Sequence, residues 1–386
     1  MQKKLIALAV AGLMSAPAFA QSSVTLYGTL DYGYVFQNRN PGAYDSGTDH
    51  VDRVRNRSAI DSGVSKANRL GFKGVEDLGN GLKAVFVYEL GLQGDGGAWK
   101  GGEARQSYGA LAGGFGTVAF GRHYTPQHLF TSAVDPFGKN GLGNAGNVLA
   151  QDKRLSNLVA YISPNWSGFS FIAAWTNSYS GNETNENRTP GIATNDARVW
   201  AFAPSFTSGG LFLGANVHEA HLSDGQVAGD VYVKHLLAWD LYAAYDFGSV
   251  KLGATYGQRR TPLTDGAGKF KVDQALIGAT IKASANDKVL VSWAYRKAQA
   301  AKILDQRDAK ISQVALGYEH ALSKRTTLYA QYAYQFQNKA QKNLETGRYA
   351  DDYGITGYGA TGVSNDGGFG GSNYRQGFAV GFRHDF

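Results

Sequence analysis

The sequence contains no cysteine among its 386 residues. Disulfide bonds and a cysteine-linked lipid anchor are therefore both excluded. After residue 20, no apolar run approaches the roughly eighteen residues of a membrane-spanning helix. The mean hydropathy is negative, at −0.29. These absences exclude a helical membrane protein.

The first twenty residues have the composition of a secretory signal peptide. Lys3 and Lys4 precede a twelve-residue apolar run over residues 5–16, and Ala18-Phe19-Ala20 matches the small-x-small cleavage pattern. A membrane anchor is the alternative, but twelve residues are too few to cross a bilayer. We expect residues 1–20 to be a signal peptide and residues 21–386 to be the exported chain.

The charge balance is only weakly basic. Without Lys3 and Lys4, the 38 basic residues become 36, against 31 acidic residues, for a net charge of +5. This excess is spread along the chain, whereas nucleic-acid binding requires a clustered basic face. Nucleic acid is therefore not an expected partner.

What the chain has in abundance is glycine and aromatic residues in an alternating pattern. It contains 51 glycines, 22 tyrosines and 20 phenylalanines but only eight prolines. In VTLYGTLDYGYVF, apolar residues recur at every second position, which is the period of a β-strand with two different faces. Sixteen segments share this pattern, beginning near residues 23, 66, 81, 103, 115, 154, 168, 195, 211, 231, 249, 270, 287, 309, 325 and 372.

The connections between these segments alternate between short and long. Seven are short turns rich in Gly, Asn, Asp and Ser, the residues of tight hairpins. Eight are long and polar, over residues 38–65, 93–102, 124–153, 180–194, 223–230, 262–269, 300–308 and 338–371. This arrangement predicts an all-β fold, a sixteen-stranded antiparallel up-and-down barrel. Because side chains cannot fill so wide a barrel, its interior must hold water and its apolar face must meet lipid.

The last strand reaches the end of the sequence. In GFAVGFRHDF, Phe378, Val380, Phe382 and Phe386 share one face. Chain ends usually fray, so a strand here indicates pairing with the first strand. We expect Phe386 on the lipid face near the rim that carries the short turns.

Four stretches together resemble the Gram-negative general porins, of the neisserial and β-proteobacterial branch. They are VTLYGTLDYG, RLGFKGVEDLGNGLKAVFVYEL, GGFGTVAFGRHY and the terminal GFRHDF. The resemblance covers all sixteen strands. It implies a homotrimer in the outer membrane of a Gram-negative bacterium, with a third external loop that folds inward and narrows each pore. It also implies that the terminal aromatic, Phe386, is read by the barrel-assembly machinery.

The resemblance also implies which residues line the constriction. The family's basic ladder falls on Arg69, Arg122 and Arg154. The facing loop motif appears as Asp135-Pro136-Phe137-Gly138, in which the acid and the proline have exchanged places relative to enteric members. Asp135 is therefore an approximate match.

Strand parity tests these positions independently. If Leu70 and Phe72 face lipid, Arg69 and Lys73 face the lumen. The same argument predicts lumenal positions for Lys83, Glu89, Arg105 and Arg154, with Tyr108 on the opposite face from Arg105. Arg122 shares the parity of Val118 and Phe120, so it needs a bulge or a place in the loop to turn inward.

Two roles for these cations remain open. They can hold the folded loop through its carboxylates, or they can create a field that selects ions by sign. Six cations (Arg69, Lys73, Lys83, Arg105, Arg122, Arg154) against Asp31, Glu89 and Asp135 predict a preference for anions. Lys139 in the loop strengthens this prediction, while Glu103 and Asp152 oppose it.

The predicted function is a passive channel for ions and small hydrophilic solutes. The alternative is a substrate-selective channel, to which Tyr27, Tyr124 and Phe137 could contribute aromatic contacts. An enzyme is disfavoured because no Ser/His pair shares a face at suitable spacing. The eight histidines lack metal-ligand spacing, and no cofactor or metal is expected. Outer-membrane lipid and lipopolysaccharide are expected partners, with divalent-ion bridging to external acidic clusters such as Asp351-Asp352.

Overall fold

The computed structural model describes residues 23–40, 55–99, 104–138, 141–151, 154–177, 198–228, 231–262, 269–299, 308–338 and 375–386. The predicted signal peptide, residues 1–20, lies outside this part of the chain. Among the described residues, no helix is long and apolar enough to cross a membrane.

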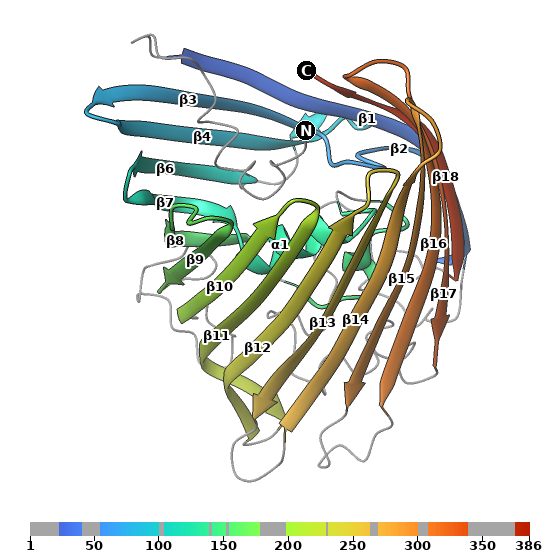
Figure 1. Ribbon diagram of the computed structural model, residues 1–386. Coiled ribbons are helices and arrows are strands. Elements are labelled where there is room, and N and C mark those ends of the chain that lie inside the picture. The colour runs from blue at the N-terminus through green and yellow to red at the C-terminus, as the bar shows by residue number, and fades with distance from the viewer. Residues whose placement is uncertain are drawn as a thin grey trace.

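The strands form one antiparallel sheet that closes on itself (Figure 1). Sixteen wall strands follow one another in sequence order: β1 (Ser23–Asn40), β3 (Arg69–Gly79), β4 (Leu82–Gln93), β6 (Gln106–Gly113), β7 (Gly116–Tyr124), β8 (Arg154–Ile162), β9 (Phe169–Thr176), β10 (Arg198–Ser208), β11 (Leu211–Ala228), β12 (Val231–Asp246), β13 (Val250–Pro262), β14 (Lys269–Lys282), β15 (Asp287–Gln299), β16 (Ala309–Ala321), β17 (Thr326–Gln337) and β18 (Gln376–Asp385). β18 pairs with β1 from Thr29↔Asp385 to Asn38↔Gln376 and closes the barrel.

Two short strands supplement the wall inside segments that the sequence predicts as loops. β2 (Arg55–Ser62) pairs with the C-terminal half of β1, and β3 pairs with the N-terminal half of β1. β2 and β3 therefore lie in line along the same edge of β1. β5 (Ala98–Trp99) pairs with the end of β4. The second wall position is therefore occupied by β2 and β3, separated by residues 63–68.

Each of the sixteen predicted strands is confirmed, with starts within a few residues of the predicted ones. The loop predicted over residues 223–230 is wrong. There the ladder continues past the predicted boundary, with Gly225↔Val233 and Gln226↔Tyr232 paired, so that only residues 229–230 separate β11 from β12. The prediction failed because this polar stretch lacks the apolar alternation that marks a lipid-facing strand.

The two faces of the wall differ in the expected way. On β14, Ile277 is 61 % exposed while its neighbour Leu276 is fully buried. Leu241, Leu316 and Phe120 are likewise exposed at outward positions. In a closed barrel of this width, such a band of exposed aliphatic and aromatic side chains is the surface that meets lipid.

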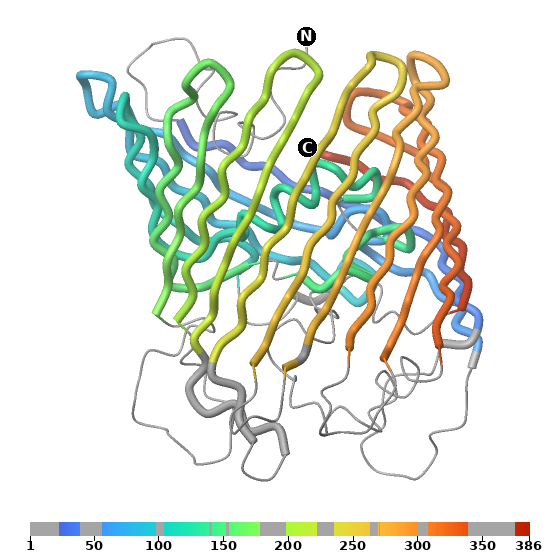
Figure 2. Tube along the Cα trace, turned by 60° about the horizontal axis from the view of Figure 1, so that its bottom comes forward, coloured from blue at the N-terminus to red at the C-terminus, as the bar shows by residue number. Residues whose placement is uncertain are grey.

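The short turns gather at one end of the barrel (Figure 2). The β3–β4 turn contains three consecutive residues with positive φ: Gly79 (86°), Asn80 (51°) and Gly81 (77°). Glycine and asparagine tolerate this left-handed region, which explains why the turn can be so tight.

The C-terminal phenylalanine is fixed to the first strand at the same end. Phe386 and Gly28 exchange two backbone hydrogen bonds, of 3.0 and 3.2 Å. A Cβ added to Gly28 would lie 2.4 Å from the Phe386 ring, so the ring lies over the glycine on the outer face. The predicted position of Phe386 is confirmed.

Candidate pore constriction

The connection between β7 and β8 folds into the barrel and carries helix α1 (Pro126–Val134) (Figure 1). Thr125 caps the helix by accepting a hydrogen bond from His128 N, and Pro126 supplies the preset φ of a first turn. A 3₁₀ turn, η3 (Ala145–Asn147), follows. The predicted inward-folded loop is therefore present, and we call its described residues, 125–138 and 141–151, the inner loop.

A polar cluster anchors α1 to the wall. Gln127 Nε2 donates to Asp240 Oδ2 at 2.8 Å, and Gln274 Nε2 donates to Asp240 Oδ1 at 2.9 Å. Arg259 Nη2 donates to Gln127 Oε1 at 3.1 Å. One turn further along the helix, the Phe130 ring packs edge-on against two wall aromatics.

Glycines in the wall let the inner loop approach closely. A Cβ added to Gly253 would lie 2.1 Å from the Val134 carbonyl oxygen. Added to Gly278 it would lie 2.4 Å from Pro136, and added to Gly317 it would lie 2.7 Å from Phe137. Real Cβ contacts are longer than 3.0 Å, so only glycine fits at these positions.

Asp135 is an internal clamp of the inner loop. Its Oδ1 accepts from Phe137 N at 2.9 Å and its Oδ2 accepts from Ala145 N at 2.8 Å. Burial raises the pKa of Asp135 to about 7, although the two amides favour the ionised form. The side chain is 6 % exposed, so this carboxylate has a different position from the predicted one, in which it faces the cations across the pore.

The other wall, from β3 to β8, gathers cations around one acid. Arg105 Nε donates to Glu89 Oε1 at 2.8 Å, and Arg69 Nη1 lies 3.5 Å from the same oxygen. Arg105 Nη2 also donates to the Tyr124 hydroxyl at 3.0 Å, and the Arg154 guanidinium lies 4.9 Å from the centre of the Tyr124 ring. These arginines come from separate strands or strand ends and converge only in the fold.

Lys73 joins this cluster through Tyr27. The Tyr27 hydroxyl donates to Glu89 Oε2 at 3.1 Å, and Lys73 Nζ lies 5.7 Å from the centre of the Tyr27 ring. We call Arg69, Lys73, Arg105 and Arg154 the basic group. Two of its members, Arg69 and Arg105, contact the carboxylate of Glu89, which is 2 % exposed, while Lys73 and Arg154 lie over the rings of Tyr27 and Tyr124.

Arg122 lies apart from the predicted lumenal wall. The β6–β7 register places it opposite Ser107, in the same set as Phe120 and Gly109, which are exposed on the outer face. The register between β7 and β8 does shift between Gly121 and His123, but the extra residue is on β8. Arg122 on β7 therefore keeps its outward position. Its Nε donates to Ala104 O at 2.8 Å and its Nη1 to Ser156 Oγ at 2.6 Å.

Arg105 contacts Glu89 as predicted for a lumenal residue, but strand parity does not explain this position. Tyr108 pairs with Val87, a buried inward residue, so Tyr108 faces inward and the predicted assignment was wrong. Arg105 precedes β6, and its backbone N donates to Glu89 O at 2.7 Å. A residue at a strand end is not bound by strand alternation, and parity therefore could not place it.

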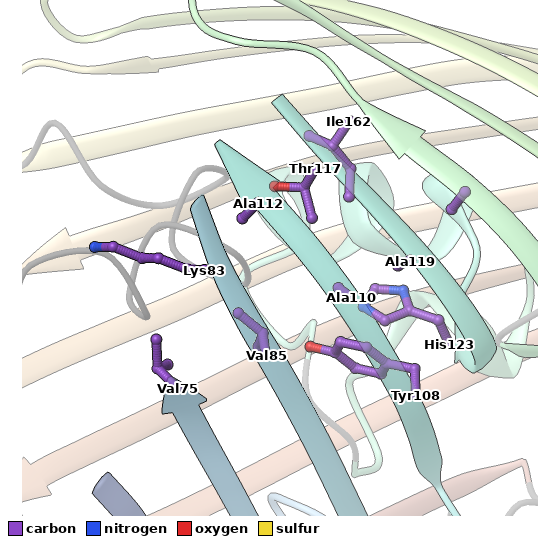
Figure 3. A pocket seen from close by; sticks show the side chains of 11 residues that line it. Val75, Lys83, Val85, Tyr108, Ala110, Ala112, Thr117, Ala119, His123 and Ile162 are labelled. Atoms are coloured by element: carbon purple, nitrogen blue, oxygen red, sulfur yellow. The ribbon is translucent and has the colours of Figure 1, made fainter. Parts of the chain in front are cut away.

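Lys83 lies at the edge of an apolar pocket near the short-turn end (Figure 3). Val85, Ala110 and Ala119 line this pocket, with Tyr108 and His123 side by side. In Figure 3 the Lys83 amine is directed away from these side chains. Lys139 lies outside the described residues.

Sequence reasoning missed three further inward cations, on β13, β15 and β18. Arg259 and Arg296 are 2 % and 3 % exposed, and Arg383 Nη1 donates to Ser65 Oγ at 2.7 Å. Parity could have found the first two, because Arg259 shares a face with Gly257 and Arg296 with Ala294, both inward. Arg383 shares the inward parity of Ala379 in the final strand.

A closed barrel with an outward apolar band, a folded inner loop and a charged inner wall defines the class of transmembrane channel proteins. Comparison with known proteins makes the assignment specific. The family model described as "Gram-negative porin" matches residues 7–341. The chain belongs to the Gram-negative porin family. It is a channel protein of the outer membrane, as the resemblance in its sequence implies.

Individual relatives agree with this assignment. The chain is 32 % identical to outer membrane porin protein 32 of Delftia acidovorans, over 89 % of this chain and 92 % of that protein. It is 27 % identical to major outer membrane protein P.IB of Neisseria meningitidis serogroup B, over 85 % of this chain and 91 % of that protein. The anion-selective porin from Comamonas acidovorans has a similar structure, with a TM-score of 0.73 and 26 % identity, over 95 % of this chain and 100 % of that chain. OmpT of Vibrio cholerae in its trimer form, at 16 % identity and a TM-score of 0.66, over 95 % of this chain and 99 % of that chain, shares the fold.

Proposed function

We propose that this porin is a passive channel that prefers anions, and that the basic group produces the preference. Among the described residues, Arg69 and Arg105 share the carboxylate of Glu89, and Lys73 lies beside them over the Tyr27 ring; this local excess of cations is the observation that carries the proposal. In a water-filled pore with low-dielectric walls, such an excess raises the local concentration of anions. The similarity to a porin described as anion-selective supports the same sign.

The inner loop offers little to oppose this field. Asp135 accepts two backbone amides inside the loop, and its pKa of about 7 leaves it only partly ionised at neutral pH. Its charge therefore faces the loop backbone instead of the pore. Arg69 and Arg105 contact the wall residue Glu89, which supports the field role for these two cations over the role of holding the loop.

The test is the zero-current potential in a planar bilayer across a tenfold KCl gradient. We expect a potential that favours chloride, and a smaller one in Lys73→Gln and Arg154→Gln. Lys310→Gln is the matched control, because it removes the same charge from the outer face of β16. A potential that favours potassium, or equal effects of all three substitutions, would refute the role of the basic group.

A substrate-selective channel remains the second candidate, supported by the Tyr27 and Tyr124 rings beside the basic group. Phe137 does not extend an aromatic track, because it is 3 % exposed and packs beneath the loop against Gly317. A binding site would make chloride current fall saturably as a competing organic anion is added. A linear dependence on its concentration would favour simple diffusion.

We also propose the assembled form and its route. The chain forms a homotrimer after removal of residues 1–20, and Phe386 is part of the signal read by the barrel-assembly machinery. The Phe386 ring over Gly28 joins the two ends of the sheet, which supports a role in closure. Mass measurement of the purified complex tests both the cleavage position and the stoichiometry.

A further inference from the structure

A row of apolar side chains crosses the inner wall near the short-turn end of the barrel. The strand register places its members directly opposite one another on five neighbouring strands, as Val75, Val85, Ala110, Ala119 and Ala160. We call these five residues the apolar row. The lumen of a wide barrel holds water and is normally lined by polar side chains. An apolar row on this face therefore calls for a partner.

The wall alone forms the pocket over the apolar row. All eleven described residues that line it come from β3, β4, β6, β7 and β8 (Figure 3). On β14 and β16 the inner loop lies on the inward face, with Pro136 against Gly278 and Phe137 against Gly317. The pocket on the other strands has a floor of alanines, and we infer that a solute in the pore covers it.

Two aromatic rings lie beside this floor. The His123 ring packs edge-on against the Tyr108 ring, with 4.8 Å between the ring centres. His123 Nδ1 donates to Tyr124 O at 2.9 Å, which fixes the plane of the imidazole. Figure 3 shows both rings next to Ala110 and Ala119, whose side chains are single methyl groups. A low floor flanked by ring edges suits a flat aromatic ring, because aromatic pairs favour offset and edge-to-face contacts.

The next row toward the constriction carries positive charge. Lys73, Val87 and Tyr108 are directly opposed across β3, β4 and β6. They lie two residues along each strand from the apolar row, a separation of about 7 Å. Two arginines already share the Glu89 carboxylate, whereas Lys73 Nζ lies 5.7 Å from the centre of the Tyr27 ring. Lys73 is therefore the cation placed to receive a carboxylate from a solute on the row.

We propose that the pocket over the apolar row binds small aromatic carboxylates on their way through the pore. The aromatic ring lies on the alanines of the row, beside Tyr108 and His123. The carboxylate lies at Lys73, and a short linker spans the distance of about 7 Å between the two rows. This inference rests on the proposed anion preference, because the basic group must first admit the solute.

The test compares hydrocinnamate with propionate as blockers of chloride current through the purified porin in a planar bilayer. Both anions carry the same carboxylate, so the ratio of their dissociation constants isolates the contribution of the ring. Partial burial of a phenyl ring on the row should make hydrocinnamate bind about tenfold more tightly. Hydrocinnamyl alcohol has the ring without the carboxylate and should block far less at the same concentration.

Two variants assign the two contacts. Ala110→Leu fills the floor of the pocket and should remove most of the tenfold advantage of hydrocinnamate, while block by propionate stays unchanged. Lys73→Gln should weaken both carboxylates by the same factor. Ala321→Leu is the matched control, because it makes the same change on the inward parity of Ala315 and Gly317, at the short-turn end of β16 and away from the pocket. It should leave both dissociation constants unchanged.

Three results would overturn the proposal: equal block by hydrocinnamate and propionate, equal effects of Ala110→Leu and Ala321→Leu, and equal block by hydrocinnamate and its alcohol. The first and third use the wild-type porin, so they do not depend on the folding of any variant. The zero-current potential of the same channels separates this inference from the proposed function. A chloride-selective pore without the tenfold ratio would refute the pocket alone, whereas a potassium-selective pore would refute the anion preference on which the pocket rests.

Discussion

The inner loop depends on a missing side chain, which makes Gly253→Ala the sharpest test of how it is held. The new Cβ would lie 2.1 Å from the Val134 carbonyl oxygen and 2.9 Å from its Cα. Ordinary carbon–oxygen contacts begin near 3.3 Å, so the end of α1 must move by about 1 Å. Lys251 is tied to the same point, since its Nζ donates to Ala133 O at 2.7 Å.

The wall is continuous behind Gly253, so the loop can move only toward the pore axis. We expect a lower single-channel conductance and a loss of stability of about 1–3 kcal/mol, the usual range for overpacking. Conductance in planar bilayers and thermal unfolding in detergent would measure the two effects. Gly109→Ala is the control, because its Cβ would meet no atom closer than 3.9 Å. If Gly253→Ala matched the wild type in both assays, the close packing of the loop on β13 would be wrong.

Three further predictions follow from other contacts. Burial raises the pKa of Asp135 from 3.8 to about 7 in the folded protein. The contribution of Asp135 to folding stability is therefore complete below pH 4 and is lost as the pH rises through 7. Asp135→Asn should abolish this pH dependence of the melting temperature. Phe386→Ala should cost about 1–3 kcal/mol, less than a fully buried ring, and Gly28→Ala should lower the melting temperature as well because its Cβ would collide with that ring. Asp31→Asn should lower the melting temperature more than Tyr329→Phe does, because Asp31 accepts from three backbone amides at residues 64–66 as well as from the Tyr329 hydroxyl; equal losses would contradict this ranking.

The sequence predicted the wall well because the lipid imposes strict alternation on each crossing. Where that constraint ends, prediction became weaker. The β11–β12 hairpin extends through polar residues with no lipid face, and Arg105 lies just before a strand. Arg122 stays on the outward set despite a register shift, because the extra residue is on its partner strand.

The candidate constriction was predicted in its residue types more than in its contacts. Arg69, Arg105 and Arg154 converge only because three hairpins set their strands side by side, which no local pattern encodes. Asp135 matched a family motif only approximately, and the displaced acid turned out to hold amides of its own loop. A carboxylate that can satisfy backbone donors within ten residues will do so when the loop is buried, since unpaired amides are costly.

One signal in the sequence does locate the wall on which the inner loop rests. A pore-facing surface should be polar, yet on β14 the inward residues Val272 and Leu276 are as apolar as outward Ile277, and inward Gly278 has no side chain. β16 repeats this with inward Ile311 and Ala315 and with Gly317 beneath Phe137. The outward face of such a strand meets lipid, but its apolar inward face cannot meet water. A protein segment must therefore cover the inward face. Strands with apolar residues on both faces and inward glycines therefore mark the part of the wall that the inner loop covers.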